Sequence, residues 1–229
     1  MLWACILLPQ LALDAVMRQR DDPAQPLALV SGPAQRRVLQ AVNPAARALG
    51  LRPGQSLTAA GLLSRDFATA EYEPAQVEHW RQFLAAWAYR FSSQVSLHYP
   101  RVLLLEVHTT MGLFGPWPQF QALLRAAHTA LGFSHRITLA PNPAAARMLA
   151  NAYDGLAITE HAPLLETLQR LPIDRVGLVT DNATALKRMG LRQLGQVLGL
   201  PREQIARRFA ATLLQHLDVL TGQRPLALE

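Results

Sequence analysis

The order of apolar runs between residues 93 and 152 constrains the fold more than any other feature of the sequence. Two short runs, Val95–Tyr99 and Val102–Val107, flank Pro100-Arg101, which predicts a pair of strands joined as a hairpin. A helical pattern, a further strand pattern and a second helical pattern follow at 117–131, 136–140 and 143–152. This region therefore reads strand, strand, helix, strand, helix.

The N-terminus supplies the missing half of that arrangement. Leu2–Leu8 is apolar throughout, which is typical of a strand buried on both faces. Residues 11–20 show a helical pattern that ends at the turn Asp21-Asp22-Pro23. Together the two regions predict a β-α-β-β-α-β core of ferredoxin-like type, so the fold class is mixed α+β.

Residues 22–75 lie inside this core as an insertion. Strand patterns cover 27–30 and 38–42, and helical patterns cover 44–49 and 56–63. Asn43 is a suitable N-cap before Pro44, and Gly50 is a suitable stop. A long helix is expected over 74–91, where the spacing of Trp80, Phe83 and Trp87 favours core positions.

The pattern changes after Ile158, and we place a domain boundary near 155–162. Strand patterns give way to five short helical patterns at 161–170, 183–190, 192–199, 201–208 and 210–221. Residues 166–210 hold eight basic and four acidic side chains. A small, basic, all-α domain is therefore expected at the C-terminal end.

Charge and cysteine content narrow the classes of protein. The net charge is +6, but only Lys187 among the 22 basic residues is a lysine, so base composition of the genome explains part of the arginine excess. One cysteine, Cys5, excludes a disulfide framework and favours a reducing cytoplasm. No apolar run reaches membrane-spanning length, and the residues before Pro9 lack the basic start of a signal peptide.

Three stretches carry a resemblance to a known family. They are Ala46–Gly54 (ARALGLRPG), the region from Leu103-Leu104-Leu105-Glu106-Val107 to Asn142-Pro143-Ala144-Ala145-Ala146-Arg147, and Leu168–Ile173 (LQRLPI) with Leu186–Leu194 (LKRMGLRQL). In this order they resemble the fingers, palm and thumb motifs of Y-family translesion DNA polymerases. The resemblance implies a palm-like part at 1–21 and 76–157, a fingers-like insertion at 22–75 and a thumb-like domain at 158–229.

The resemblance also implies where a polymerase would hold two Mg²⁺ ions. The family's metal-ligating acids align with Cys5 and Leu7 on the first strand and with Arg101 and Val102 at the hairpin. Mg²⁺ requires hard oxygen ligands, which none of these side chains offers. We therefore expect no catalytic residue, no resident metal or cofactor and no polymerase activity.

Some positions that meet DNA or nucleotide in the family keep a basic residue. Arg47 and Arg147 match motif positions, and Lys187, Arg188 and Arg192 belong to the thumb line. Guanidinium groups suit bidentate phosphate contacts. The thumb hairpin at 177–182 lacks its second glycine and carries Asp181, which would oppose a phosphate, so DNA contact there is expected to be weak.

The replaced acids make the chain similar to the ImuB branch of this family. That resemblance implies a non-catalytic adaptor in SOS-induced translesion synthesis, DNA repair and mutagenesis, located in the cytoplasm and associated with the nucleoid. The implied partners are an ImuA-like protein, an error-prone C-family DNA polymerase, the sliding clamp through a region beyond this chain, and primer-template DNA, with no membrane. Relatives of this kind are longer, so we expect the chain to be a fragment.

Two other hypotheses remain open. An active, divergent Mg²⁺-dependent polymerase would have to use Asp14, Asp66 and Glu106, and two of these carboxylates would have to share a metal position. A simple DNA-binding module would show affinity that falls steeply with salt. Glu106 is more readily explained as a strand residue with a structural partner. His98 and His108 could approach each other across the paired strands.

Overall fold

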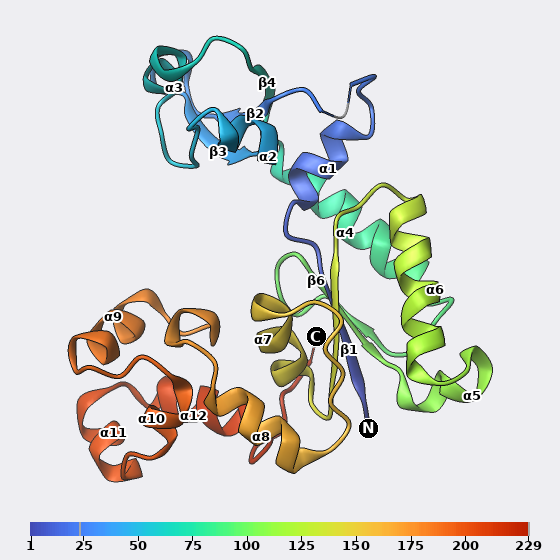
Figure 1. Cartoon of the computed structure of the whole chain (residues 1–229), viewed down its shortest axis with the longest axis vertical. Helices are drawn as coiled ribbons and strands as arrows, with labels where there is room; N and C mark the ends of the chain where they lie inside the picture. The colour runs from blue at the N-terminus through green and yellow to red at the C-terminus, as the bar shows by residue number, and fades with distance from the viewer. Residues whose placement is uncertain (23, 229) are drawn as a thin grey trace. The chain divides into compact units, whose positions relative to one another are not determined.

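The computed structural model describes residues 1–22 and 24–228, which form two compact units (Figure 1). One unit contains Met1–Leu7, Ala85–Leu123 and His135–Glu229, and the other contains Leu8–Leu84 and Leu124–Ser134. The turn predicted at residues 21–23 includes Pro23, which lies outside the described residues, and the boundaries of the three predicted parts stay a prediction.

A four-stranded antiparallel sheet organises the first unit. Its order is β5-β6-β1-β7, with the hairpin partners β5 and β6 on one side of the central β1 and β7 on the other. This is the order of a ferredoxin-like sheet, which confirms the predicted fold class. The strands are β1 (Trp3–Leu7), β5 (Val95–Ser96), β6 (Val102–Glu106) and β7 (Arg136–Ala140).

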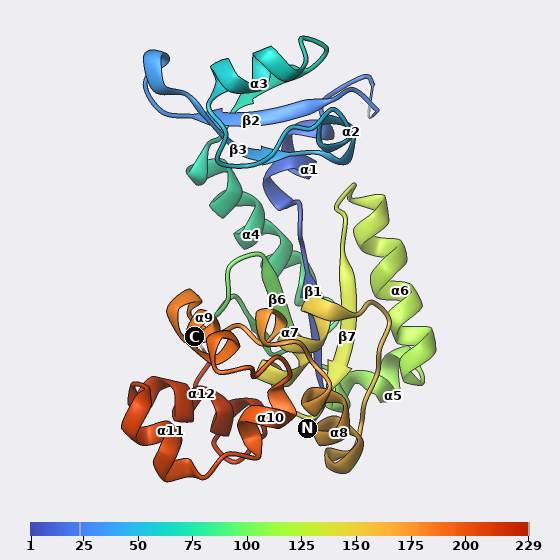
Figure 2. The same cartoon turned by 60° about the vertical axis from the view of Figure 1, so that its left-hand side comes forward.

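The central strand is apolar at every position because both faces of the sheet are covered. Successive side chains of a strand point to opposite faces. Trp3 and Cys5 belong to the same buried cluster as helix α7 (Pro143–Ala152), which lies across one face of the sheet (Figure 2). Ala4 and Ile6, which alternate with them, are also fully buried. The N-terminal run is thus a core strand, as predicted.

Aromatic side chains pack together around the segment that connects β6 to the long helix after it. Phe114 stacks on Phe120 with ring centroids 4.7 Å apart, and Phe91 lies 5.6 Å from Phe114. This segment contains a short helix that the sequence did not reveal. The elements are 3-10 helix η2 (His108–Thr110), α5 (Met111–Phe114) and α6 (Trp117–Ala130).

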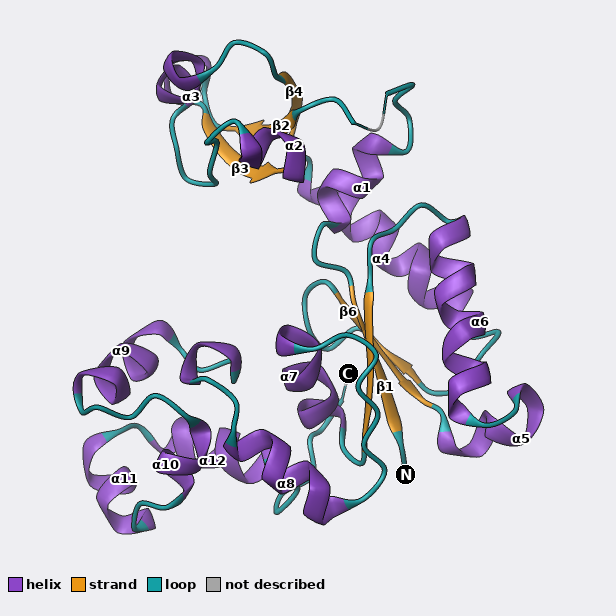
Figure 3. Ribbon diagram, viewed as in Figure 1, coloured by secondary structure: helices purple, strands orange, loops and turns teal. Residues whose placement is uncertain are grey.

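The C-terminal part of this unit is helical over its described residues, as predicted (Figure 3). Leu164, Leu168 and Leu217 belong to the same hydrophobic cluster as β1 and β6, so the helices share one core with the sheet. The elements are α8 (His161–Gln169), 3-10 helix η3 (Ile173–Arg175), α9 (Thr180–Arg188), α10 (Leu194–Leu198), α11 (Arg202–Arg208) and α12 (Ala211–Leu220).

The second unit is built on a three-stranded sheet of order β3-β2-β4. The sequence predicted β2 and β3 but missed β4, which pairs parallel with β2. Asn43 and Ser56 cap the two helices that follow β3 by accepting backbone hydrogen bonds. The elements are α1 (Leu11–Met17), β2 (Leu27–Ser31), 3-10 helix η1 (Ala34–Arg36), β3 (Val38–Val42), α2 (Pro44–Ala48), α3 (Leu57–Leu63) and β4 (Ala68–Glu71).

Helix α4 (Pro74–Ala88) contributes residues to both units. The prediction that its aromatic residues all belong to the core is wrong for Phe83, which is 41% exposed. The ring centroid of Trp80 lies 5.4 Å from that of Phe133.

None of the described helices has both the length and the apolar character needed to cross a membrane.

Candidate functional site

The tip of the β5–β6 hairpin brings together three of the four positions that the sequence assigns to metal ligands. Leu7 is the direct antiparallel partner of Val102, and Arg101 precedes Val102 in the turn. Cys5 pairs with Leu104, two residue pairs further from the tip, and lies on the same face of β1 as Leu7. The two strands thus do meet where the resemblance places the site.

The side chains at this tip do not fit Mg²⁺. Leu7 and Val102 carry no polar atoms, and the guanidinium of Arg101 repels a cation. Burial raises the pKa of the Cys5 thiol to about 12, although the charge of Arg147 works in the opposite direction. Among the described residues, no group of three or more His, Cys, Asp or Glu side chains is arranged to hold a metal ion. We derive no metal-dependent step from this site.

The backbone of Arg101 adopts an unusual conformation at the hairpin tip. Its φ of 58° is the one positive value at a residue other than glycine in the described part of the chain. An L-residue other than glycine, asparagine or aspartate pays a steric penalty there. The turn thus positions a basic, exposed side chain just before the start of β6, next to the buried Val102.

Glu106, at the other end of β6, is engaged by the surrounding backbone. Its carboxylate accepts hydrogen bonds from the Leu2 and His108 amides and from the Thr109 amide and hydroxyl, the last at 2.8 Å. Burial alone would raise the pKa of Glu106, but these hydrogen bonds outweigh it and hold the pKa below its ordinary value. The carboxylate therefore has the structural partners that we expected.

The other two candidate carboxylates lie in the second unit. Asp14 on α1 is buried and accepts hydrogen bonds from the Ser134 amide at 2.7 Å and the Ser134 hydroxyl at 3.3 Å. Asp66 is exposed in the loop after α3. Asp14 thus also has a structural role, and its contacts link α1 to the residues before β7.

Arg47 lies in the last turn of α2 with its side chain exposed. No ion pair of Arg47 occurs among the described residues, so its guanidinium is free to meet an anion. The guanidinium of the neighbouring Arg52 already has protein partners, because it donates hydrogen bonds to the carbonyl oxygens of Arg47 and Leu51, each at 2.7 Å. Of the two arginines in this motif, only Arg47 therefore has a guanidinium that is available to an anion.

Arg147 on α7 points into the protein rather than toward solvent. Its guanidinium lies 4.0 Å from the ring centroid of Tyr99, a cation–π contact. Burial raises the pKa of Tyr99, while the charge and hydrogen bond of Arg147 partly oppose that rise. Arg147 also lies near Gly177, where an added Cβ would be 3.5 Å from its Nη1. This arginine therefore joins the hairpin to the C-terminal helices.

Lys187, Arg188 and Arg192 differ in whether they already form an ion pair. Lys187 pairs with Asp174 at 2.7 Å, so its charge is already compensated. Arg188 and Arg192 are exposed, and neither forms an ion pair with any described residue. Asp181, which belongs to the segment 177–182, lies in the first turn of α9. The positive charge available to an anion here rests on Arg188 and Arg192.

The strand register keeps His98 and His108 apart, in agreement with separate core or surface roles. Val95 pairs with Leu105 and Ser96 with Leu104, so His98 falls near the hairpin tip while His108 follows the far end of β6. The two rings therefore do not share a site. Sequence reasoning missed His216 on α12, whose Nε2 lies 2.7 Å from the Val176 carbonyl oxygen. Burial lowers the pKa of His216, that hydrogen bond opposes the change, and the charge of Arg147 adds to it.

Comparisons with known proteins identify the family and the fold of the chain. The impB/mucB/samB family (IMS) matches residues 13–151, more than half of the chain. Protein ImuB of Caulobacter vibrioides (strain NA1000 / CB15N) is 32% identical over 180 residues, which cover 79% of this chain and 39% of that protein. Protein ImuB of Caulobacter vibrioides strain ATCC 19089 / CIP 103742 / CB 15 gives the same values.

Solved structures show the same fold. DinB from Sulfolobus solfataricus superposes with a TM-score of 0.80 at 16% identity, covering 100% of this chain and 69% of that chain. The insertion ternary complex of Dbh DNA polymerase gives a TM-score of 0.82 at 15% identity, covering 100% of this chain and 70% of that chain.

The chain therefore has the fold of Y-family DNA polymerases. The chain belongs to the impB/mucB/samB family. It spans 39% of the length of the Caulobacter proteins that it matches.

Proposed function

We propose that the chain is a non-catalytic, Y-family polymerase-like adaptor of translesion synthesis and mutagenesis. The observation that carries this proposal is the hairpin tip, where Leu7 faces Val102 and Arg101 occupies the turn. A two-metal polymerase needs carboxylates at such a site to orient the attacking hydroxyl and neutralise the triphosphate. The nearest carboxylate on the same strand, Glu106, is engaged by backbone donors instead.

The adaptor would act in the SOS response in the cytoplasm, with an ImuA-like protein, an error-prone C-family polymerase and the sliding clamp as partners. Two features support this setting: the identity to ImuB proteins and a sheet that keeps the polymerase fold without metal-ligating side chains at the hairpin tip. In this proposal the protein needs no resident Mg²⁺ and holds other proteins rather than synthesising DNA.

A primer-extension assay tests the absence of catalysis. We expect the purified protein to add no nucleotide to a primer-template in the presence of Mg²⁺ and all four deoxynucleotides. The informative companion is the triple variant Leu7→Asp, Arg101→Asp, Val102→Glu. Because the strand register brings these positions together, we expect this variant to gain Mg²⁺ binding in calorimetry. Extension by the unsubstituted chain would overturn the proposal and restore the active-polymerase hypothesis.

DNA binding without catalysis is a second candidate function, favoured by the exposed Arg47, Arg188 and Arg192. Each phosphate contact releases condensed counterions, so the logarithm of the affinity should fall linearly with the logarithm of the salt concentration. We expect Arg188→Ala with Arg192→Ala to reduce both the affinity for a primer-template and the salt slope. Lys187→Ala is the matched control, because its charge is already paired with Asp174. Salt-independent binding would argue against this function.

A further inference from the structure

Two arginines converge on one backbone oxygen at the C-terminal end of α7. Arg136, the first residue of β7, donates from Nη1 to the carbonyl oxygen of Asn151 at 3.4 Å. Arg175, the last residue of η3, donates from Nη1 to the same oxygen at 3.2 Å. The side-chain amide of Asn151 in turn donates to the Arg175 carbonyl oxygen at 3.2 Å. Asn151 therefore holds the two guanidinium groups close to each other.

No acidic side chain in the described part of the chain forms an ion pair with either arginine. The acids that are nearest to the pair in sequence have other partners. Asp174 pairs with Lys187 at 2.7 Å, and Asp154 accepts a hydrogen bond from the Ile137 amide at 2.9 Å. The positive charge of the two guanidinium groups is therefore not compensated by these carboxylates.

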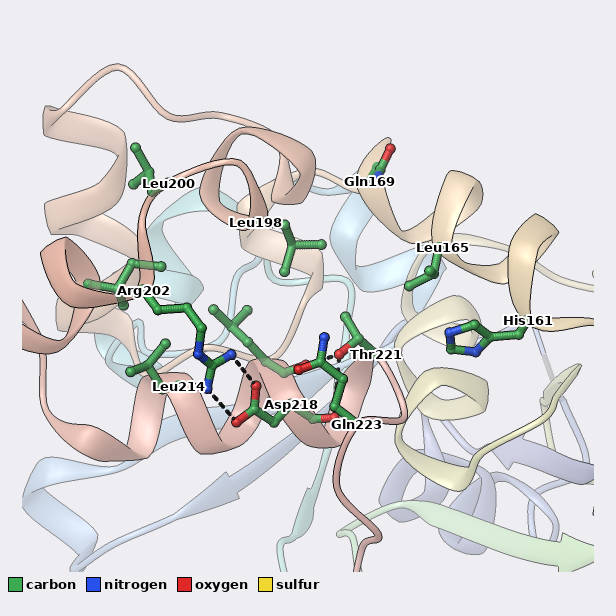
Figure 4. A pocket seen from close by; sticks show the side chains of 12 residues that line it. His161, Leu165, Gln169, Leu198, Leu200, Arg202, Leu214, Asp218, Thr221 and Gln223 are labelled. Carbon is green, nitrogen blue, oxygen red and sulfur yellow. Dashed lines mark hydrogen bonds and ion pairs between the residues drawn. The ribbon is translucent and has the colours of Figure 1, made fainter.

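Arg202 of the same unit shows the usual way in which a guanidinium is compensated. It donates two hydrogen bonds to the carboxylate of Asp218, at 2.7 and 2.9 Å, drawn as dashed lines in Figure 4. Arg136 and Arg175 share a carbonyl oxygen instead. The carbonyl groups at the C-terminal end of a helix together carry a partial charge of about −0.5, which is too small to balance two full positive charges. A net positive charge therefore remains at this end of α7.

The surroundings do not supply the missing negative charge. Arg136 is the direct partner of Leu7 in the sheet, and Leu7 pairs on its other side with Val102, so the neighbouring strand positions are apolar. Arg147, one turn earlier on α7, adds a third guanidinium, which lies close to Gly177 in the segment after η3. Like charges repel, so these groups are held together at lower cost when an anion lies between them.

We propose that Arg136 and Arg175 form a binding site for a phosphate group that needs no metal ion. Guanidinium groups present parallel N–H donors that match the oxygens of a phosphate. A phosphate monoester carries a charge of about −1.5 to −2 at pH 7, which balances two arginines, whereas a carboxylate balances only one. The site uses none of the arginines considered above for DNA binding. It goes beyond the proposed adaptor function and does not depend on it.

Isothermal titration calorimetry with inorganic pyrophosphate, in a buffer that contains EDTA, tests the site. We expect the parent protein to bind pyrophosphate without a divalent cation. Arg136→Gln and Arg175→Gln should each weaken binding about tenfold or more, because each removes a charge-assisted contact. Arg65→Gln is the matched control: it removes the same charge from an exposed position of the other unit, and binding should stay within about twofold. Absence of binding in EDTA, or an equal loss in the control, would overturn the proposal.

Arg175→Lys distinguishes a geometric site from general electrostatic attraction. Lysine keeps the charge but lacks the planar set of donors, so binding should weaken about threefold or more. Arg175 is exposed, so its variants should keep the melting temperature of the parent. A lysine variant that binds pyrophosphate as tightly as the parent would contradict the two-arginine site.

Competition experiments identify the source of the phosphate. Displacement of pyrophosphate by a 5′-phosphorylated oligonucleotide, but not by the same oligonucleotide with a 5′-hydroxyl, would support a site for the end of a nucleic-acid strand. Displacement by neither would support a site for a free phosphate compound. Displacement by a poly-glutamate peptide at lower concentrations than by either oligonucleotide would make an acidic protein segment the ligand and refute the phosphate assignment.

Discussion

At the scale of single residues, Glu106 makes the stability of the folded protein depend on pH. The pKa of this carboxylate is lowered in the folded protein from its ordinary value of 4.5. Its contribution to stability is therefore fully present above about pH 4.5 and is lost as the pH falls through the lower, folded-state pKa. Stability rises with pH through this range because the native structure prefers the charged form of the carboxylate.

Glu106→Gln should reduce the free energy of unfolding by about 1–3 kcal/mol at pH 7, because several donors lose a charged acceptor. Urea denaturation at pH 7, 5.5 and 4 measures the effect. The difference between parent and variant should shrink toward the lowest pH. Glu203→Gln, at an exposed side chain, should change stability by no more than about 0.5 kcal/mol at any of these values. An equal loss at all three pH values would contradict the assigned role of the charge.

Arg101 provides a second test at the same scale. Its left-handed backbone conformation suits asparagine and penalises β-branched side chains. Arg101→Asn should leave the free energy of unfolding unchanged or raise it by up to about 1 kcal/mol, whereas Arg101→Val should lower it by about 1–2 kcal/mol. Thermal denaturation of the two variants makes the comparison. A more stable valine variant would show that the turn can adopt another conformation.

At the scale of elements, Asn43 connects a helix cap to a sheet. Its side-chain oxygen accepts from the Ala46 and Leu27 amides, and its amide donates to the Gln25 carbonyl. Asn43→Ala should cost about 2–3 kcal/mol, since a cap and two further hydrogen bonds are lost. Ser56→Ala, which removes only the cap of α3, should cost about 1 kcal/mol. Chemical denaturation compares them, and equal losses would mean that the two further hydrogen bonds contribute little.

The same elements show what sequence reasoning can and cannot determine. Asn43-Pro44 predicted a helix start correctly, because capping depends on adjacent residues alone. Strand β4 was missed, since its sequence Ala-Thr-Ala-Glu has little intrinsic strand preference and pairing with β2 supplies the order. The contact of Arg147 with Tyr99 was equally out of reach, because it depends on packing between distant segments.

The candidate site was predictable in part. The family resemblance placed the metal-ligand positions at the first strand and the hairpin, and the residue types there indicated that Mg²⁺ cannot bind, since no shift of register places an acid in the first strand. The pairing of Leu7 with Val102 needed the structure, because a slip of one residue changes every side chain of a strand to the other face.

At the scale of the whole molecule, Cys5 reports on global unfolding. It is the single cysteine of the chain, its side chain is fully buried, and burial raises its pKa to about 12. Thiol reagents attack the thiolate, so at pH 8 we expect negligible reaction in native buffer and rapid reaction in denaturant. The time course with a chromogenic disulfide reagent measures both. Fast labelling of the native protein would show that β1 opens locally.

The core shared by the sheet and the C-terminal helices has a consequence for unfolding. Leu164, Leu168 and Leu217 pack in one cluster with the central strand, and Arg147 adds a contact between α7 and Tyr99. Pulling these helices away from the sheet would expose the apolar side chains of that cluster to water, which costs free energy.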